Sequence, residues 1–285
     1  MKLATALQLG RISNLPTVWS NVLVGTLLAG GLLGDLRIPA LMLALSAFYV
    51  GGMFLNDAFD RGFDAKHRPE RPIPAGRASA AEVFAWGYGL MAAGALGVGL
   101  AGAWHWRALL SAAALAAAIV LYNAHHKGNP LSPLVMGLCR VCVVTTAGYG
   151  LATALPPAVL LAAAALLCHL IGLTYIAKQE HLDRVGSLWP LAFLALPVAY
   201  GAVLASAAPL AWPLLALYFG LLIFALSRLR RRAPGDVPRA VVMLIAGMSV
   251  LDAVLLAGGG QALGAGLALV AFVLTLRLQR WVAGT

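Results

Sequence analysis

Long apolar stretches separated by shorter polar ones dominate the hydrophobicity pattern of this chain. Ten apolar segments each approach the roughly 20 residues that a helix needs to cross a bilayer core. They cover residues 17–33, 38–57, 81–103, 107–123, 131–152, 157–177, 188–207, 211–227, 238–257 and 262–279. The pattern predicts an all-α, polytopic transmembrane bundle of nine to ten helices, nine if one segment is a surface helix, formed by a single integral-membrane domain over residues 1–285.

Composition agrees with this pattern and argues against a soluble protein. Hydrophobic residues make up 61% of the chain and charged residues 11%, whereas soluble domains carry roughly 25% charge. The mean hydropathy is +0.88. We find neither a soluble domain nor a long linker in the sequence, so the lipid bilayer is the expected environment.

Positive charge is distributed unevenly between the loops. If the N-terminus is cytoplasmic and all ten segments span, 18 of the 20 Lys and Arg residues lie inside, and only Arg37 and Arg107 lie outside. This satisfies the positive-inside rule and predicts an inner, cytoplasmic-membrane protein with both termini in the cytoplasm. The net charge of +10 is then explained by topology and phosphate chemistry, and it gives no reason to expect a nucleic-acid partner.

The strongest chemical signal is the motif NDAFDRGFD at residues 56–64, at the end of the second apolar segment. Carboxylates at a membrane boundary are costly and usually functional. Asn56, Asp60 and Asp64 are four residues apart, so on a helix they share one face. We include the adjoining Asp57 in the candidate ligand set. Few oxygen ligands with open positions suit Mg²⁺ that holds substrate phosphates.

A basic, proline-rich run follows this motif at residues 65–77, and it supplies Arg68 and Arg77 as candidate pyrophosphate-binding residues. A solvated, positive-inside loop would also explain these arginines. It would not explain the regular spacing of acidic residues in a chain that holds only ten Asp and Glu.

The motif NDxxDxxxD followed by RPERPIPAGR, residues 68–77, resembles the first signature of the UbiA superfamily of intramembrane prenyltransferases. The resemblance implies a UbiA-like helical bundle, which usually has nine helices. It also implies Mg²⁺ as cofactor, a polyprenyl pyrophosphate as donor, and an aromatic or other lipophilic acceptor.

Two more segments resemble parts of this family. RISNLPTVWSN, residues 11–21, is similar to the entry of the first helix and makes Arg11 and Asn14 candidate pyrophosphate ligands; an interfacial anchor is the alternative. YNAHHK, residues 122–127, is similar to the loop in which a lysine meets the pyrophosphate. This makes Lys127 a candidate pyrophosphate ligand. The alternative is that Lys127 only extends its charge to the membrane interface, as lysines at the ends of membrane spans often do. We interpret the neighbouring His125 and His126 as interfacial.

The second acidic signature of the family is altered here. In residues 175–186, Glu180 matches an acidic position, but Lys178 stands where the first Asp is expected. The resemblance makes Lys178 and Glu180 candidate catalytic residues, and Asp183 a candidate metal ligand from a neighbouring position. The lysine could instead bind pyrophosphate as a fixed cation. Because it replaces an acidic ligand of the second metal site, the sequence leaves open whether one or two Mg²⁺ ions bind. The pattern resembles a divergent branch, the UbiA-like EboC proteins.

Several polar residues fall inside apolar segments. Arg140 lies slightly inside the fifth segment, and a phosphate is one candidate partner. Asp252 lies in the middle of a segment and is either functional or a structural, paired carboxyl. We interpret His169 and the three cysteines as buried structural residues, and the run of arginines from 228 to 232 as a positive-inside anchor.

Prenyl transfer also requires an apolar site that shields an allylic cation from water. We expect Phe54, Tyr122 and Tyr175 to present rings to this cation. The alternative function is a transporter, lipid-handling protein or scaffold on the same fold, which the altered second motif favours. The intact first motif counts against it, because transport alone needs no hard-cation pyrophosphate site.

Overall fold

The computed structural model describes residues 1–178, 189–231, 233–282 and 284. In these residues the chain forms eleven α-helices and two short 3₁₀ helices, η1 (Ile12–Asn14) and η3 (Trp189–Leu194). The α-helices are α1 (Leu3–Leu9), α2 (Leu15–Leu28), α3 (Arg37–His67), α4 (Ala80–Ala101), α5 (Trp106–His125), α6 (Ser132–Tyr149), α7 (Pro157–Ala177), α8 (Ala195–Ala207), α9 (Ala211–Arg231), α10 (Asp236–Gly258) and α11 (Ala262–Leu278). The predicted all-α bundle is confirmed.

Helices α2 to α11 correspond one to one to the ten apolar segments. In the part of the chain that the structure describes, eight helical stretches are long and apolar enough to cross a membrane, with η3 and α8 counted together. The other two, α2 with 14 residues and α11 with 17, are shorter than the roughly 20 residues of a full span. Helix α2 ends early because Gly30, with φ +94°, begins a turn that only glycine adopts readily.

Local signals in the sequence explain several helix boundaries. Helix α3 extends ten residues beyond the predicted apolar segment, since no proline follows that segment before Pro69, and the residue before a proline avoids helical geometry. Helix α4 begins with an N-cap, in which the Ser79 hydroxyl accepts from the Glu82 backbone N–H at 3.2 Å. Proline in the first turn of α6 and of α7 marks two further starts.

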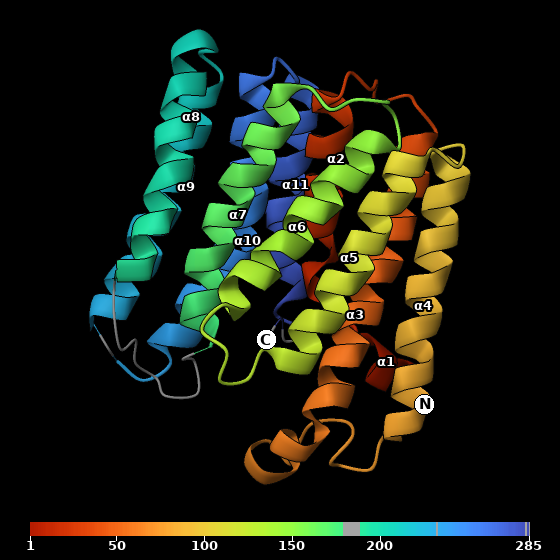
Figure 1. Cartoon of the computed structure of the whole chain (residues 1–285). Coiled ribbons are helices and arrows are strands. Elements are labelled where there is room, and N and C mark those ends of the chain that lie inside the picture. Colours follow the sequence, from red (N-terminus) through yellow and green to blue (C-terminus); the bar gives the residue numbers. More distant parts are fainter. Residues whose placement is uncertain (179–188, 232, 283, 285) are drawn as a thin grey trace.

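The helices pack around two main apolar cores. One core lies between α7, α9 and α10 and also takes residues from α2 and α11, whereas the second lies between α2, α3, α4, α5 and α6. Helix α2 contributes to both cores and contacts α6, α10 and α11. Figure 1 shows the helices running side by side between two ends of the bundle.

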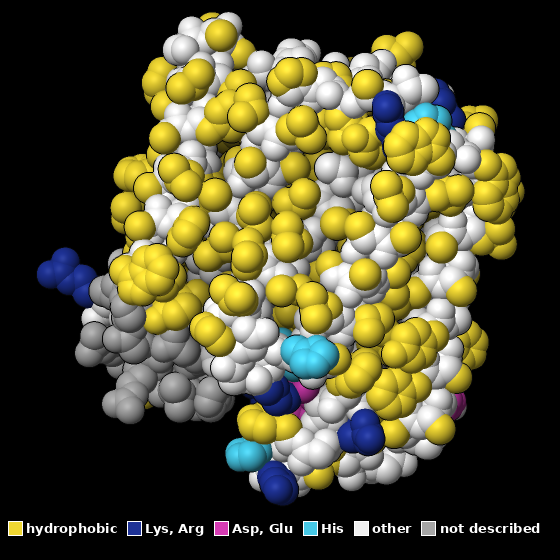
Figure 2. All heavy atoms as spheres, viewed as in Figure 1, with side chains coloured by type: hydrophobic (Ala, Val, Ile, Leu, Met, Phe, Trp, Pro, Cys, Tyr) yellow, Lys and Arg dark blue, Asp and Glu magenta, His cyan; other side chains and the backbone are white. Residues whose placement is uncertain are grey.

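The two ends of the bundle differ in character. Both chain termini and the α3–α4, α5–α6 and α9–α10 loops lie at the lower end in Figure 1. Figure 2 shows hydrophobic side chains over most of the viewed face, with Lys, Arg and His side chains mainly near the lower end and a smaller group at the upper right. The chain is an integral membrane protein with most of its polar chemistry at one end.

Candidate functional site

Helix α3 carries the acidic motif at the polar end of the bundle. Asn56, Asp60 and Asp64 follow one another at intervals of four residues, so their side chains lie along one helix face. Asn56 and Asp64 are buried, and Asp60 is partly buried. Because α3 continues to His67 without a break, the whole motif is helical. The structure therefore places these three oxygen-bearing side chains in one stripe.

Two arginines from different segments converge on Asp57, next to this stripe. Arg11 Nη2 lies 3.4 Å from Asp57 Oδ1, and Arg71 Nη1 lies 3.6 Å from the same oxygen. Arg11 also donates to Asn56 Oδ1 at 3.1 Å. One carboxylate therefore faces two guanidinium groups, which leaves net positive charge beside the stripe and suits a bound anion.

Arg71 belongs to the α3–α4 loop and folds back against the stripe. Burial lowers the pKa of Arg71, and the positive charges of Arg11 and Arg68 lower it further, whereas Asp57 and Asp64 raise it. A phosphate bound here would relieve this repulsion between cations. Arg71 is not among the residues predicted from the sequence, although it lies inside the RPERPIPAGR motif. Several arginines share that loop, and only the folded path shows which one reaches α3.

The C-terminal end of α5 supplies positive groups from the other side. Lys127 Nζ lies 3.1 Å from Asp60 Oδ2 and 3.5 Å from the centre of the Phe63 ring. His126 Nε2 lies 3.4 Å from the same carboxylate oxygen, and its ring stacks on Tyr122. Our sequence interpretation of His126 was interfacial; the structure places it against the acidic stripe as well.

Amide side chains connect the stripe to neighbouring helices. Asn56 donates to Asn123 Oδ1 at 3.0 Å, and Asn123 donates to the Gly52 carbonyl oxygen at 3.1 Å. Asn123 is therefore a further site residue that the sequence analysis missed. Asn14, a predicted pyrophosphate ligand, instead donates to the Gly284 carbonyl at 2.9 Å and accepts from Gln279 at 2.9 Å.

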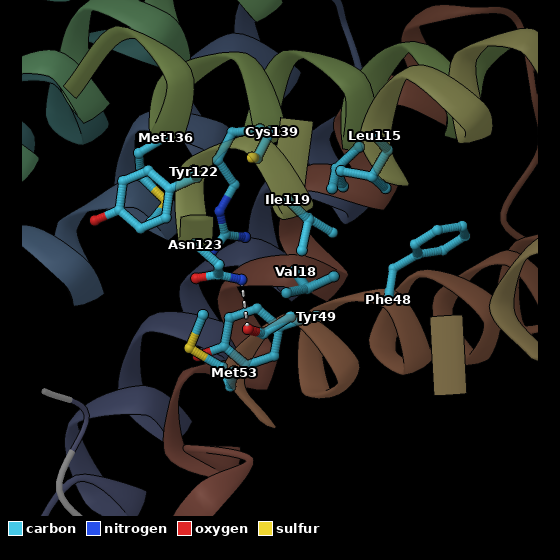
Figure 3. A pocket seen from close by; sticks show the side chains of 13 residues that line it. Val18, Phe48, Tyr49, Met53, Leu115, Ile119, Tyr122, Asn123, Met136 and Cys139 are labelled. Atoms are coloured by element: carbon cyan, nitrogen blue, oxygen red, sulfur yellow. Dashed lines mark hydrogen bonds between the residues drawn. The ribbon is translucent and has the colours of Figure 1, made fainter. Parts of the chain in front are cut away.

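An apolar pocket lies beside the stripe, between α2, α3, α5 and α6, with about 520 Å³ of empty space including its mouth. Figure 3 shows Tyr49 and Met53 of α3 facing Tyr122 and Asn123 of α5 and Met136 and Cys139 of α6. The pocket wall also holds Arg140, whose guanidinium group lies 5.7 Å from the Tyr49 ring.

Of the three rings expected to face a cation, only Tyr122 lines this pocket. Phe54 is buried in a small cluster with Leu9 and Ala58, and Tyr175 packs against the core around α7 and α10. Phe48 and Tyr49 of α3 are the other aromatic residues in the pocket wall. Helical periodicity does separate these residues, because Tyr49 lies seven positions before Asn56 and shares its face of α3, whereas Phe54 lies about 140° around the helix from Tyr49. The sequence could therefore have selected Tyr49.

Other predicted residues lie away from the stripe or outside the described chain. Arg77 donates to Gln8 Oε1 at 2.9 Å and to the Glu70 carbonyl at 2.6 Å, so it ties the loop to α1. Glu180 and Asp183 lie outside the described residues. Arg68, which caps the end of α3, has no side-chain hydrogen bond or ion pair to any residue that the structure describes.

Lys178, at the end of α7, contacts the α5–α6 loop. It donates to the Asn129 carbonyl at 2.7 Å and to Ser132 Oγ at 2.7 Å. Burial lowers its pKa. In the described residues this lysine therefore fixes the loop that follows Lys127. Its ammonium group contacts that loop and not the acidic stripe.

The donor chemistry of the stripe fits Mg²⁺. Across the described ranges, no group of three or more His, Cys, Asp or Glu residues is arranged to hold a metal ion. Asp60 and Asp64 lie one helical turn apart and Asn56 adds an amide oxygen. Asp64 is 5% exposed, and its carboxylate has no hydrogen bond or ion pair within the described part of the chain. Few protein oxygens, completed by substrate phosphate, are typical of Mg²⁺ sites.

Comparison with known sequences identifies similar proteins. The UbiA prenyltransferase family model matches residues 18–248. The digeranylgeranylglyceryl phosphate synthase of Methanopyrus kandleri is 36% identical over 201 residues, which cover 68% of this chain and 69% of that protein. The synthase of the same name from Methanothrix thermoacetophila is 36% identical over 129 residues, and this match spans 47% of its length, about half.

Comparison with solved structures gives the same fold. The apo structure of a UbiA homolog from Aeropyrum pernix K1 matches with a TM-score of 0.70 and 21% identity, covering 86% of this chain and 96% of that one. A structure from work on digeranylgeranylglyceryl phosphate synthase in membranes has a TM-score of 0.65 and 18% identity, covering 90% and 98%. At these identities the likeness concerns the fold.

Proposed function

This chain belongs to the UbiA prenyltransferase family, and from that premise we propose that it transfers a prenyl group from a polyprenyl pyrophosphate to a lipophilic acceptor within the membrane. One observation carries the proposal: the stripe of Asn56, Asp60 and Asp64 has cations on both sides and an apolar pocket beside it. The side-chain oxygens of the stripe can bind a metal ion, and the neighbouring arginine and lysine side chains can bind an anion. Together they suit a metal-bound pyrophosphate.

Arg11, Arg71 and Lys127 hold the pyrophosphate in this proposal, and Asp60 and Asp64 with Asn56 hold Mg²⁺. Bound Mg²⁺ supplies positive charge that stabilises the pyrophosphate as a leaving group. In this proposal the two arginines and the lysine surround the place where negative charge develops, which favours cleavage of the allylic C–O bond. Glu180 remains a proposed catalytic residue, and Asp183 remains a proposed further metal ligand.

The pocket accommodates the reacting end of the prenyl chain. Its walls are largely apolar, so they exclude the water that would quench an allylic cation. The rings of Tyr49 and Tyr122 lie in the pocket wall and stabilise a positive charge by cation–π attraction. The acceptor then donates an electron pair to the allylic carbon as pyrophosphate leaves, and the acceptor loses a proton.

We propose a glyceryl phosphate lipid with a free hydroxyl group as the acceptor. The names of the curated relatives, digeranylgeranylglyceryl phosphate synthases, support this choice. The cationic rim also suits an acceptor that carries its own phosphate. An aromatic acceptor is the alternative that our sequence analysis allowed, because many electron-rich groups can capture an allylic cation.

We further propose that the polar end faces the cytoplasm from the inner membrane, with both termini on that side. The distribution of Lys and Arg between the loops supports this orientation. Both substrates then meet the enzyme with phosphate groups at the cytoplasmic interface and hydrocarbon tails in the bilayer.

The test is a transfer assay with purified protein, Mg²⁺ and geranylgeranyl pyrophosphate, with products identified by mass spectrometry. One reaction receives geranylgeranylglyceryl phosphate and another receives 4-hydroxybenzoate. We expect the doubly prenylated glyceryl phosphate in the first reaction. Asp64→Asn should lower the rate about 100-fold or more, by loss of a charged ligand. The matched control Asp35→Asn changes a carboxylate that pairs with Arg37 at the other end of the bundle and should remain active.

Product only with 4-hydroxybenzoate would replace the glyceryl phosphate acceptor with an aromatic one and leave prenyl transfer intact. Binding of both substrates without any transfer product would contradict the enzymatic proposal. That result would instead support a transporter or lipid-handling role.

A further inference from the structure

A buried polar network joins α2, α6 and α10 behind the pocket. Arg140 of α6 donates to Asn21 Oδ1 at 3.0 Å and to Thr17 Oγ1 at 3.2 Å. Asn21 in turn donates to Asp252 Oδ2 of α10 at 2.8 Å. Asn21 and Asp252 are fully buried, and Arg140 is 8% exposed. A single amide side chain therefore bridges a cation and a carboxyl group inside the bundle.

Arg140 is the member of this network that reaches the pocket. Among the described residues, no carboxylate lies within ion-pair distance of it. A guanidinium group has five N–H donors, and the bonds to α2 leave some of them for another acceptor. A buried cation without a direct anionic partner is costly, so a negatively charged ligand group would be favoured beside it.

Asp252 is poorly explained as a stabilising residue. One of its oxygens, Oδ1, has no hydrogen-bond partner among the residues that the structure describes. Burying an unpaired carboxyl oxygen costs free energy, and an apolar side chain would fill the same space without that cost. What the carboxyl does provide is an acceptor for the Asn21 amide N–H, which directs the amide oxygen of Asn21 toward Arg140.

We propose that Asp252, acting through Asn21, is a positioning residue that fixes Arg140 in the pocket wall so that it binds a phosphate group of a lipid substrate. This inference rests on the proposed prenyl transfer. It makes α10, which contributes no residue to the acidic stripe, a part of the substrate site. The phosphate could belong to the prenyl donor or to the acceptor, because both present the same chemistry to a guanidinium group.

The test measures KM, kcat and equilibrium binding of geranylgeranyl pyrophosphate and of geranylgeranylglyceryl phosphate with the full-length protein. Asp252→Leu removes the acceptor for Asn21 and should raise KM for one of the two lipids about tenfold, as expected for a weakened hydrogen bond to a charged group, with kcat changed less. Asp252→Asn keeps an acceptor and should restore most of the affinity. The lipid whose KM rises identifies the phosphate that Arg140 binds.

A matched control separates positioning from simple stability. Tyr218→Phe removes the hydrogen bond of 2.8 Å between Tyr218 of α9 and His169 of α7, which joins two other helices and involves neither Arg140 nor Asp252. We expect it to leave both KM values within about twofold while lowering the melting temperature, because it removes only a structural bond. Arg140→Gln should raise the KM for the same lipid as Asp252→Leu does. The double variant should have a KM no higher than that of Arg140→Gln, because both substitutions act on one chain of contacts.

Three outcomes would overturn the inference. Unchanged affinity in a folded Asp252→Leu protein would remove the positioning role and leave prenyl transfer intact. Additive effects of Asp252→Leu and Arg140→Gln would show that Asp252 acts independently of Arg140. Wild-type protein that binds neither lipid would overturn the proposed function and this inference together.

Discussion

Arg71 and Arg77 lie in the same loop but make different contacts. Arg71 is close to the Asp57 carboxylate, whereas Arg77 is exposed and bonds to Gln8 and to a backbone carbonyl. The sequence motif contains both residues and indicates a pyrophosphate-binding loop, but it cannot rank its arginines. That ranking depends on how the loop folds back onto α3, which is a tertiary property.

We predict that Arg71→Gln raises the Kd for geranylgeranyl pyrophosphate by about tenfold or more, since it removes a charge-assisted contact. Arg77→Gln is the matched control from the same loop and should change the Kd by less than about threefold, as expected for an exposed charge. Binding of labelled lipid to purified protein measures both values. Equal losses in the two variants would contradict the assigned role of Arg71.

Part of the candidate site could be predicted from the spacing of residues within one helix. The spacing of Asn56, Asp60 and Asp64 is periodic, so the sequence alone predicts a shared helix face. Asn123 and His126 approach this stripe from α5, more than 60 residues away along the chain. No local pattern encodes such an approach. Glu180 and Asp183 stay predictions, because they lie outside the described residues.

At the scale of whole helices, α2 is the element that ties the two cores together. Its backbone lies very close to α6 at Gly25, where an added Cβ would sit 2.3 Å from the Val144 carbonyl oxygen and 2.9 Å from Ala147 Cβ. Small residues permit such close helix packing in membranes. The abundance of glycine indicated close packing in general, but not which helices would meet.

We predict that Gly25→Ala destabilises the protein by about 1–3 kcal/mol, because the new methyl group must displace backbone. The control is Gly89→Ala on α4, where a Cβ would meet nothing within 4 Å. That change should be neutral or stabilising by up to about 1 kcal/mol, because alanine favours helix. Unfolding in mixed micelles under denaturant measures both effects. Equal stability of the two variants would argue against the close α2–α6 contact.

The continuation of α3 beyond the apolar segment matters for function. The hydrophobic pattern ends near residue 57, but the helix ends ten residues later. Hydrophobicity predicted the part inside the bilayer, whereas helix propensity and Pro69 determined the actual end. Because of this extension, Asp60 and Asp64 are presented on a rigid helix at the membrane surface instead of in a loop.

For the whole molecule, sequence predicted the class of fold well. Apolar segments long enough to span leave few alternatives to a helical bundle, because backbone polar groups must be satisfied within the membrane. The sequence could not show that α2 contributes to both cores. Asp252 is conspicuous in the sequence, but its connection to the pocket through Asn21 depends on packing between distant helices and could not be predicted.

The proposed orientation makes a prediction about labelling. Gly34→Cys lies in the α2–α3 loop and Ala75→Cys in the α3–α4 loop, at opposite ends of α3. In intact cells, a membrane-impermeant maleimide should label the first variant and not the second. Labelling of the second should require permeabilised cells, because the basic loops face the cytoplasm. The reversed pattern would contradict the orientation. The wild type, whose native cysteines lie in helices, provides the background.

The central claim is that the acidic stripe on α3 binds a prenyl pyrophosphate with Mg²⁺ for group transfer. The most direct measurement is binding of labelled geranylgeranyl pyrophosphate, together with pyrophosphate release, by purified wild-type and Asp60→Ala protein with and without Mg²⁺. We expect binding and release to require Mg²⁺ and to be lost in the variant. Absence of binding in wild-type protein, or Mg²⁺-independent binding that survives the substitution, would contradict it.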